Sequence, residues 1–123
     1  MKKIVVFGAS GDTGQYFIKY FLEHYKDEEY QIVATGTRET DYFDQLNIPY
    51  YRVDITNKNE FSKLPNDVYA VVDLAGAMPA RMKGYNPYKY IDVNIIGNLN
   101  ILEYCRKNNV DRILFAQSFG DIK

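Results

Sequence analysis

The chain has 123 residues, 46% of them hydrophobic, and its 15 basic and 16 acidic residues give a formal net charge of -1. This length is typical of one domain, and we treat residues 1–123 as one domain. The balanced charge gives no basic surface for nucleic acid or an anionic membrane, and no apolar run approaches the ~20 residues of a spanning helix. With a single cysteine, Cys105, the chain is expected to be cytoplasmic, with neither nucleic acid nor membrane as a partner.

The first two predicted elements are a strand and a helix on either side of a glycine-rich segment. Residues 4–7 form a short β-branched and aromatic run that ends at Gly8, as expected of a strand buried on both faces. Residues 13–25 carry apolar side chains at the spacing of an amphipathic helix. The apolar stripe of that helix consists of Phe17, Ile18, Phe21, Leu22 and Tyr25.

Further runs of strand length follow at 31–34, 50–53, 69–74 and 112–116, joined by polar segments and by a helix predicted over 88–107. One apolar stripe of that helix contains Ile91, Ile95, Leu99 and Leu102. Its second apolar face, with Ile96, Ile101 and Tyr104, is expected to favour a homo-oligomer.

Alternating strand and helix signals predict an α/β fold: a Rossmann-like, doubly wound parallel sheet of about five strands, in three layers. After the fifth strand only residues 117–123 remain. Ile113, Leu114 and Phe115 would then form an apolar sheet edge, which intact proteins usually cover. We therefore expect the chain to be truncated after strand five.

Three glycines, Gly8, Gly11 and Gly14, lie between the first strand and the first helix as G-x-x-G-x-x-G. Glycines here allow a tight turn and let a pyrophosphate approach the backbone. The helix that follows begins with free N–H groups that face the anion. The alternative is a glycine-rich turn without a ligand. Three polar neighbours can cap the helix and join the cofactor site: Ser10, Asp12 and Thr13.

The segment VVFGASGDTGQY resembles the opening of the short-chain dehydrogenase/reductase superfamily. VDIT, DLAGA and NIIGNLNILEYCRKNNVDRILFAQS, in this order, are similar to later segments of its extended, epimerase/dehydratase type. Asp12 and Thr13 differ from the apolar pair usual in extended members and look more like atypical relatives. The resemblance implies an NAD(P)-binding domain, and it implies further cofactor-binding residues at Asp54, Ile55, Leu74, Ala75, Gly76 and Asn94.

The segment after the second strand, ATGTRET, bears on the choice between NADP and NAD. An acid about twenty residues beyond the glycines commonly binds a ribose 2′-hydroxyl, whereas an arginine accommodates a 2′-phosphate. Here Thr37 and Arg38 occupy that region, which favours NADP. Two alternatives stay open: Arg38 is a solvated surface cation, or Glu39 binds the ribose of NAD.

The resemblance also implies a catalytic serine, tyrosine and lysine, the last two as Y-x-x-x-K after the serine. Ser118 matches the serine, but no tyrosine follows it, so we expect an incomplete triad and no turnover by this chain alone. Tyr85 and Lys89 have the Y-x-x-x-K spacing but precede Ser118, against the family order. No metal site is expected from one histidine and one distant cysteine.

Two functions follow from these residues. The first is the cofactor-binding portion of an epimerase, dehydratase or reductase that acts on a nucleotide sugar or a similar polar alcohol. The second is a non-catalytic module that binds a dinucleotide or docks on a partner. A structural remnant without a ligand is a third possibility.

Overall fold

The computed structural model describes residues 1–25, 29–75, 88 and 91–116. Five parallel strands form one sheet in the order β3-β2-β1-β4-β5. They are β1 (Lys2–Phe7), β2 (Tyr30–Gly36), β3 (Tyr50–Arg52), β4 (Ala70–Asp73) and β5 (Ile113–Phe115). This order is that of the first five strands of a doubly wound dinucleotide-binding sheet, and the predicted fold class is confirmed.

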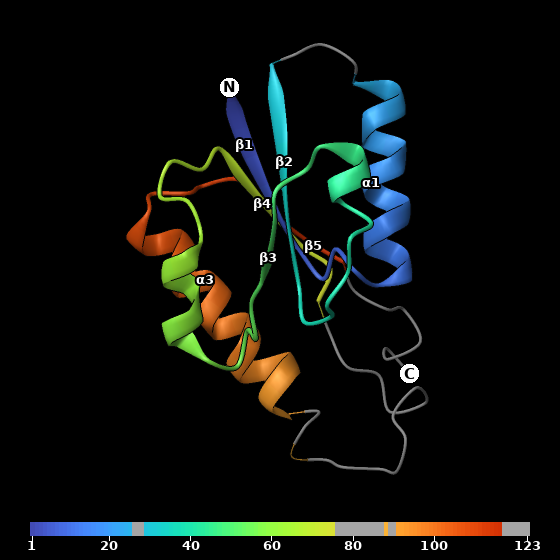
Figure 1. Ribbon diagram of the computed structural model, residues 1–123. Helices are drawn as coiled ribbons and strands as arrows, with labels where there is room; N and C mark the ends of the chain where they lie inside the picture. Colours follow the sequence, from blue (N-terminus) through green and yellow to red (C-terminus); the bar gives the residue numbers. More distant parts are fainter. Residues whose placement is uncertain (26–28, 76–87, 89–90, 117–123) are drawn as a thin grey trace, which may run out of the picture.

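Helices cover both faces of the sheet, which confirms the three layers (Figure 1). Helix α1 (Asp12–His24) and the short 3₁₀ helix η1 (Asp44–Leu46) lie on one side. The 3₁₀ helix η2 (Lys58–Lys63) and α3 (Asn98–Lys107) lie on the other, and the π-helix η4 (Asp92–Gly97) leads into α3. The crossovers to and from β3 contain only 3₁₀ helices, which are too short to show a helical period in the sequence.

Each face of the sheet has its own hydrophobic core, because alternate residues of a strand point to opposite faces. In β1, Ile4 and Val6 point toward α1, while Val5 and Phe7 point toward α3. The α1 side also buries Ala9, Ile18, Ile32, Ala34, Phe43, Ile48 and Val72. The α3 side buries Val33, Val53, Ile55, Phe61, Leu64, Val71, Ile101, Tyr104, Cys105 and Val110.

Strand β1 begins two residues earlier than its apolar run predicts. Lys2 and Lys3 pair in register with Tyr30 and Gln31 of β2, so the backbone ladder extends past the buried part of the strand. Lys2 also forms an exposed ion pair with Glu29, over 2.7 Å. Polar side chains at an exposed strand end carry no hydrophobic signal, which is why the sequence placed the strand start too late.

The apolar faces of the helix predicted over 88–107 are assigned differently by the structure. Ile101 and Tyr104, expected on an exposed second face, are buried against the sheet. The stripe that was expected to define the helix is instead exposed: Ile91 47%, Ile95 59%, Leu99 53% and Leu102 42%. Gly97 fits this orientation, because a Cβ there would lie 2.5 Å from Ile55 Cδ1. The prediction that Ile101 and Tyr104 favour oligomers is therefore wrong.

Among the residues that the structure describes, no helix has the length and apolar character needed to cross a membrane.

Candidate functional site

The predicted cofactor residues that the structure describes gather at the carboxyl edge of the sheet. Gly8 follows β1, Thr37 follows β2, Asp54 lies just after β3, and Leu74 follows β4. In open parallel sheets, ligands bind beyond the carboxyl ends of the strands, where neighbouring crossovers go to opposite faces. Here β1 lies between β2 and β4, so the glycine turn after β1 is at the centre of that edge.

Gly8 and Gly14 are required by close packing within the chain. Gly8 has φ +78°, and a Cβ there would lie 2.7 Å from the Ala75 nitrogen. A Cβ on Gly14 would overlap the carbonyl oxygen of Gly8, and it would lie 2.6 Å from the Ala9 Cα. These two glycines therefore let α1 and the end of β4 pack directly against the turn.

Gly11 has a different environment. A Cβ on Gly11 would meet only the Gly8 carbonyl oxygen, at an ordinary 3.6 Å. Gly11 is also the N-cap of α1, and among the described residues no side chain forms a hydrogen bond that caps this helix. The prediction that Ser10, Asp12 or Thr13 caps this helix is thus not met, and in the described part of the chain the first-turn N–H groups have no side-chain acceptor. Open space above an uncapped helix start is what a pyrophosphate requires.

Polar contacts attach the segment after β2 to the glycine turn and to β3. Arg38 Nη1 donates to the carbonyl oxygen of Ser10 over 3.3 Å, and Gln15 Nε2 donates to the same oxygen over 3.0 Å. Tyr50 Oη donates to the Arg38 carbonyl over 2.6 Å. Ser10 is itself buried, at 6% exposed, and its carbonyl connects the glycine turn with Arg38.

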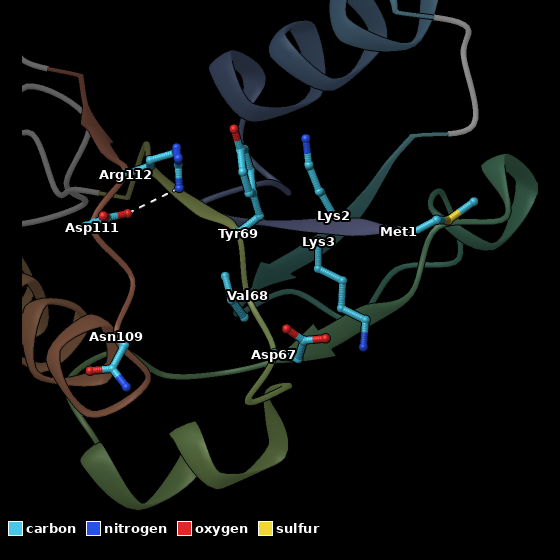
Figure 2. Close-up of a pocket in the computed structure, with 9 residues that line it drawn as sticks. All are labelled: Met1, Lys2, Lys3, Asp67, Val68, Tyr69, Asn109, Asp111 and Arg112. Carbon is cyan, nitrogen blue, oxygen red and sulfur yellow. Dashed lines mark hydrogen bonds and ion pairs between the residues drawn. The ribbon is translucent and has the colours of Figure 1, made fainter.

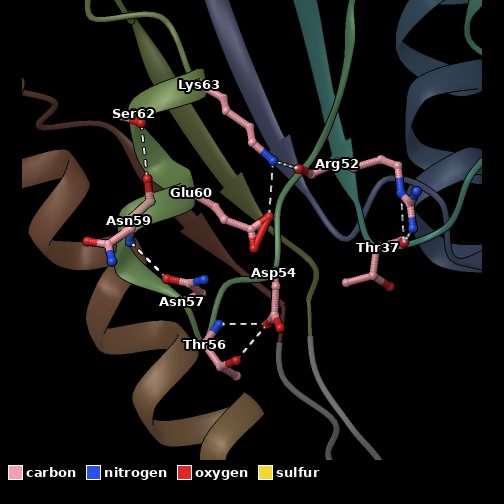
Figure 3. A network of polar contacts seen from close by, with 9 residues as sticks. All are labelled: Thr37, Arg52, Asp54, Thr56, Asn57, Asn59, Glu60, Ser62 and Lys63. Carbon is pink, nitrogen blue, oxygen red and sulfur yellow. Dashed lines mark hydrogen bonds and ion pairs between the residues drawn. The ribbon is translucent and has the colours of Figure 1, made fainter.

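Asp54 and Ile55 follow β3 and have opposite environments. Asp54 is exposed, and its Oδ1 accepts from Thr56 N at 3.0 Å and Thr56 Oγ1 at 2.7 Å (Figure 3). The Ile55 side chain is buried in the core below α3, and its carbonyl accepts from Asn100 Nδ2 over 2.8 Å. Asp54 is therefore the more accessible of these two predicted cofactor-binding residues.

Asp73, the last residue of β4, has a buried carboxyl group next to the glycine turn. It pairs in register with Phe7 and is 2% exposed. Its Oδ1 accepts from the Ala75 N–H over 3.1 Å, while its Oδ2 has no hydrogen-bond partner among the described residues. Burial raises the pKa of this carboxyl group to about 6, and the Ala75 hydrogen bond opposes the shift. The charge state of Asp73 thus changes near neutral pH.

Other predicted residues are placed in part. Asn94 lies within η4, and its carbonyl accepts from Asn98 Nδ2 over 2.7 Å. Gly76, Ser118 and the Tyr85–Lys89 pair lie outside the described residues. The structure therefore brings together the glycine turn with Arg38 and with the end of β4, and leaves the predicted catalytic serine undescribed.

Sequence reasoning missed three residues of this edge: Tyr50, Arg52 and Asp73. Arg52 Nε and Nη2 donate to the Thr37 carbonyl over 3.3 and 3.1 Å (Figure 3). Tyr50 and Arg52 are two residues apart on β3, so their side chains share a face and reach the same segment. That alternation was available in the sequence, but the pairing of β3 with β2 was needed to identify the target.

A cavity of about 240 Å³ lies at the opposite, amino edge of the sheet (Figure 2). The Tyr69 ring centroid is 5.0 Å from Lys2 Nζ and 4.3 Å from Arg112 Cζ. These cation–π contacts connect the starts of β1, β4 and β5. Because ligands of parallel α/β sheets bind at the carboxyl edge, we do not assign the cofactor to this cavity.

The described residues fit a dinucleotide at the carboxyl edge. Gly11 leaves room for a pyrophosphate, the start of α1 offers free N–H donors, and Arg38 adds a cation beside the turn. A side chain in place of Gly11 would occupy the space for the pyrophosphate and would add no packing contacts inside the protein.

Comparisons with known proteins identify the family of this chain. The model of the NAD dependent epimerase/dehydratase family matches residues 4–122. Protein CapI of Staphylococcus aureus is 30% identical over 94% of this chain and 37% of its own length. A UDP-N-acetylglucosamine 4,6-dehydratase (inverting) of Campylobacter jejuni is 29% identical over 92% of this chain and 35% of its own. The chain thus spans well under half the length of these relatives.

Solved structures show the same fold. A UDP-glucose 4-epimerase of Thermotoga maritima superposes with a TM-score of 0.77 at 22% identity, over 96% of this chain and 38% of its own. An L-threonine dehydrogenase of Clostridium difficile superposes with a TM-score of 0.78 at 23% identity, over 96% of this chain and 37% of its own. With the glycine turn, the strand order and the match over residues 4–122 all in agreement, this chain belongs to the NAD-dependent epimerase/dehydratase family.

Proposed function

We propose that residues 1–123 are the cofactor-binding domain of an epimerase, dehydratase or reductase that acts on a nucleotide sugar or a similar polar alcohol, and that the domain prefers NADP to NAD. Family membership supports a nicotinamide dinucleotide. The names of relatives, among them UDP-N-acetylglucosamine 4,6-dehydratase and UDP-glucuronate 4-epimerase, support the substrate class.

The chain's own residues have distinct roles in this proposal. The N–H groups at the start of α1 and the open backbone at Gly11 bind the pyrophosphate. Asp54 contacts the adenine end, and the Leu74–Ala75 backbone next to Gly8 contacts the cofactor on the β4 side. A bound nicotinamide supplies hydride transfer. Ser118, whose role stays a prediction, orients the substrate oxygen.

The contact between Arg38 and the glycine turn is the observation that supports the proposed preference for NADP. Arg38 is exposed, and its Nη1 donates to the Ser10 carbonyl over 3.3 Å, so one end of its guanidinium lies beside the turn. No ion pair of Arg38 occurs among the described residues. A planar cation without a counter-charge, held in place after β2, suits a 2′-phosphate.

Calorimetric titration of the 123-residue chain with NADP and NAD tests both parts of the proposal. We expect saturable binding of both and tighter binding of NADP. Arg38→Gln should weaken the binding of NADP by on the order of tenfold and should change the affinity for NAD by less than about twofold. Arg106→Gln, which removes an arginine paired with Glu103 on α3, is the matched control and should change neither. Absence of binding to both dinucleotides by the folded chain would refute dinucleotide binding, and equal affinities would refute the NADP preference.

The oligomeric state and the cytoplasmic location also belong to this proposal. The exposed apolar stripe of Ile91, Ile95, Leu99 and Leu102 replaces the face first predicted for self-association. On β5, Leu114 is 56% and Phe115 41% exposed. Apolar surface of this kind favours a homo-oligomer. Sedimentation at tens of micromolar should show an oligomer that Leu99→Glu weakens, and a monomeric wild type would count against it.

A further inference from the structure

We propose that Arg52 is a second residue that determines cofactor specificity, and that Arg38 and Arg52 together bind the 2′-phosphate of NADP. This inference rests on the proposed function and extends it to a residue that lies on another strand. Arg52 is the last residue of β3, on the outer strand of the described sheet, and its side chain is exposed.

Arg52 is bound to the same two-residue segment that carries Arg38. Its Nε and Nη2 both donate to the Thr37 carbonyl, at 3.3 and 3.1 Å (Figure 3). Tyr50, on the same face of β3, donates to the carbonyl of Arg38. The two strand residues thus hold Thr37 and Arg38 in place, and they bring a second guanidinium next to the end of β2.

The unused donors of Arg52 are suited to a phosphate. A guanidinium has five N–H groups, and two of those of Arg52 are used by Thr37, so three remain. Nearby charges are already satisfied: Glu60 pairs with Lys63 over 3.1 Å, and Asp54 Oδ1 accepts from Thr56. No described ion pair includes Arg52.

The location identifies the 2′-phosphate as the group that is bound. In doubly wound folds, the ribose of the adenosine half is recognised just after the second strand, which here is Thr37–Arg38. The proposed site of the pyrophosphate is the start of α1, which is a different segment from Thr37–Arg38. An arginine fixed to the Thr37 carbonyl therefore distinguishes dinucleotides by the ribose substituent and not by the pyrophosphate.

A purely structural role of Arg52, supporting the Thr37 carbonyl, makes a different prediction. If only the hydrogen bonds matter, a substitution that loosens Thr37 weakens ligands with and without the phosphate alike. If the charge matters, the loss is confined to ligands that carry the 2′-phosphate, and lysine retains part of the affinity.

The test compares adenosine 2′,5′-bisphosphate with adenosine 5′-monophosphate on the 123-residue chain, by calorimetry at fixed salt. Arg52→Gln should weaken the bisphosphate by on the order of tenfold and the monophosphate by less than about twofold. Arg52→Lys should lose less of the affinity for the bisphosphate, and the control Arg106→Gln should leave both affinities unchanged. The thermal unfolding midpoint of each variant verifies that it is folded.

The outcomes separate this inference from the proposed function. If wild type prefers the bisphosphate and Arg52→Gln leaves that preference unchanged, or weakens both ligands equally, the assignment of Arg52 is wrong while Arg38 retains its role. If the wild type binds neither ligand, the dinucleotide site itself is wrong, and Arg52 is wrong with it.

Discussion

A Cβ placed on Gly14 would overlap the carbonyl oxygen of Gly8, so the first turn of α1 packs directly on the residue that ends β1. Gly11, midway between them, has φ -78° and ψ 171°, which any residue can adopt, and a Cβ there would make only an ordinary contact with the Gly8 carbonyl oxygen, at 3.6 Å. The spacing of the three glycines is the same along the chain, yet only the outer two are required for packing.

Substitution by alanine should therefore separate the two kinds of glycine. Gly14→Ala should lower the free energy of unfolding by about 1–3 kcal/mol or more, because the backbone of Gly8 and Ala9 must shift. Gly11→Ala should change the free energy of unfolding by less than about 1 kcal/mol, because the reduced freedom of the unfolded chain is opposed by the poorer N-cap preference of alanine. Urea unfolding measures both, and equal losses would contradict the assignment.

The buried carboxyl of Asp73 should make stability depend on pH. Its pKa is about 6 in the folded chain against an ordinary 3.8, so the folded chain binds this proton more tightly than the unfolded chain does. The resulting stabilisation is full below about pH 4 and is lost as the pH rises through about 6. Between these limits the free energy of unfolding falls by up to about 3 kcal/mol. Asp73→Asn should remove this slope in urea unfolding at pH 4, 5, 6 and 7, and an unchanged slope would show that another group titrates.

Opposite faces of α3 should respond differently to truncation. Ile101 is 0% exposed, so Ile101→Ala should destabilise the chain by about 2–4 kcal/mol. Leu99 is 53% exposed, and Leu99→Ala should change stability by no more than about 0.5 kcal/mol. Thermal unfolding of the two variants decides between the structure and the sequence-based assignment, which expects the reverse order.

Cys105 offers a chemical probe of the folded state. The thiol is 1% exposed, and burial together with the charge of Asp73 raises its pKa from 9.0 to about 11. Two pKa units reduce the thiolate fraction by about 100-fold at neutral pH, since only the thiolate reacts. Alkylation should therefore be at least about 100-fold slower in buffer than in denaturant. Comparable rates in both would show that α3 does not remain packed on the sheet.

The sequence was sufficient for the order of elements and for the glycine turn. Apolar runs of four to six residues between polar segments identify buried parallel strands, and the glycines identify the turn after β1. The faces of α3 could not be identified in this way, because Leu99 and Ile101 belong to two apolar faces and periodicity does not say which one faces the sheet. The close approach of Gly97 to Ile55 fits the observed orientation, and it joins residues far apart in the sequence.

Some residues of the candidate site could likewise be predicted from the sequence, and others could not. Arg38 could be found from its distance to the glycines, because the ribose-binding position follows the second strand. Arg52 and Tyr50 could not, because their targets are backbone carbonyls of a neighbouring strand end. The raised pKa of Asp73 likewise depends on burial by surrounding elements, which a single sequence does not reveal.

We propose that the space over Gly11 at the start of α1 binds a dinucleotide pyrophosphate, and Gly11→Val tests this proposal directly. The backbone here is extended and a Cβ would meet only the Gly8 carbonyl oxygen at 3.6 Å, so the variant should fold, with a free energy of unfolding lower by about 1 kcal/mol because valine is a poorer N-cap than glycine. Titrated with NADP, the wild type should bind saturably, and the variant should bind at least about tenfold more weakly because its side chain blocks the approach of the phosphates. A folded variant that binds NADP as tightly as the wild type would contradict the account.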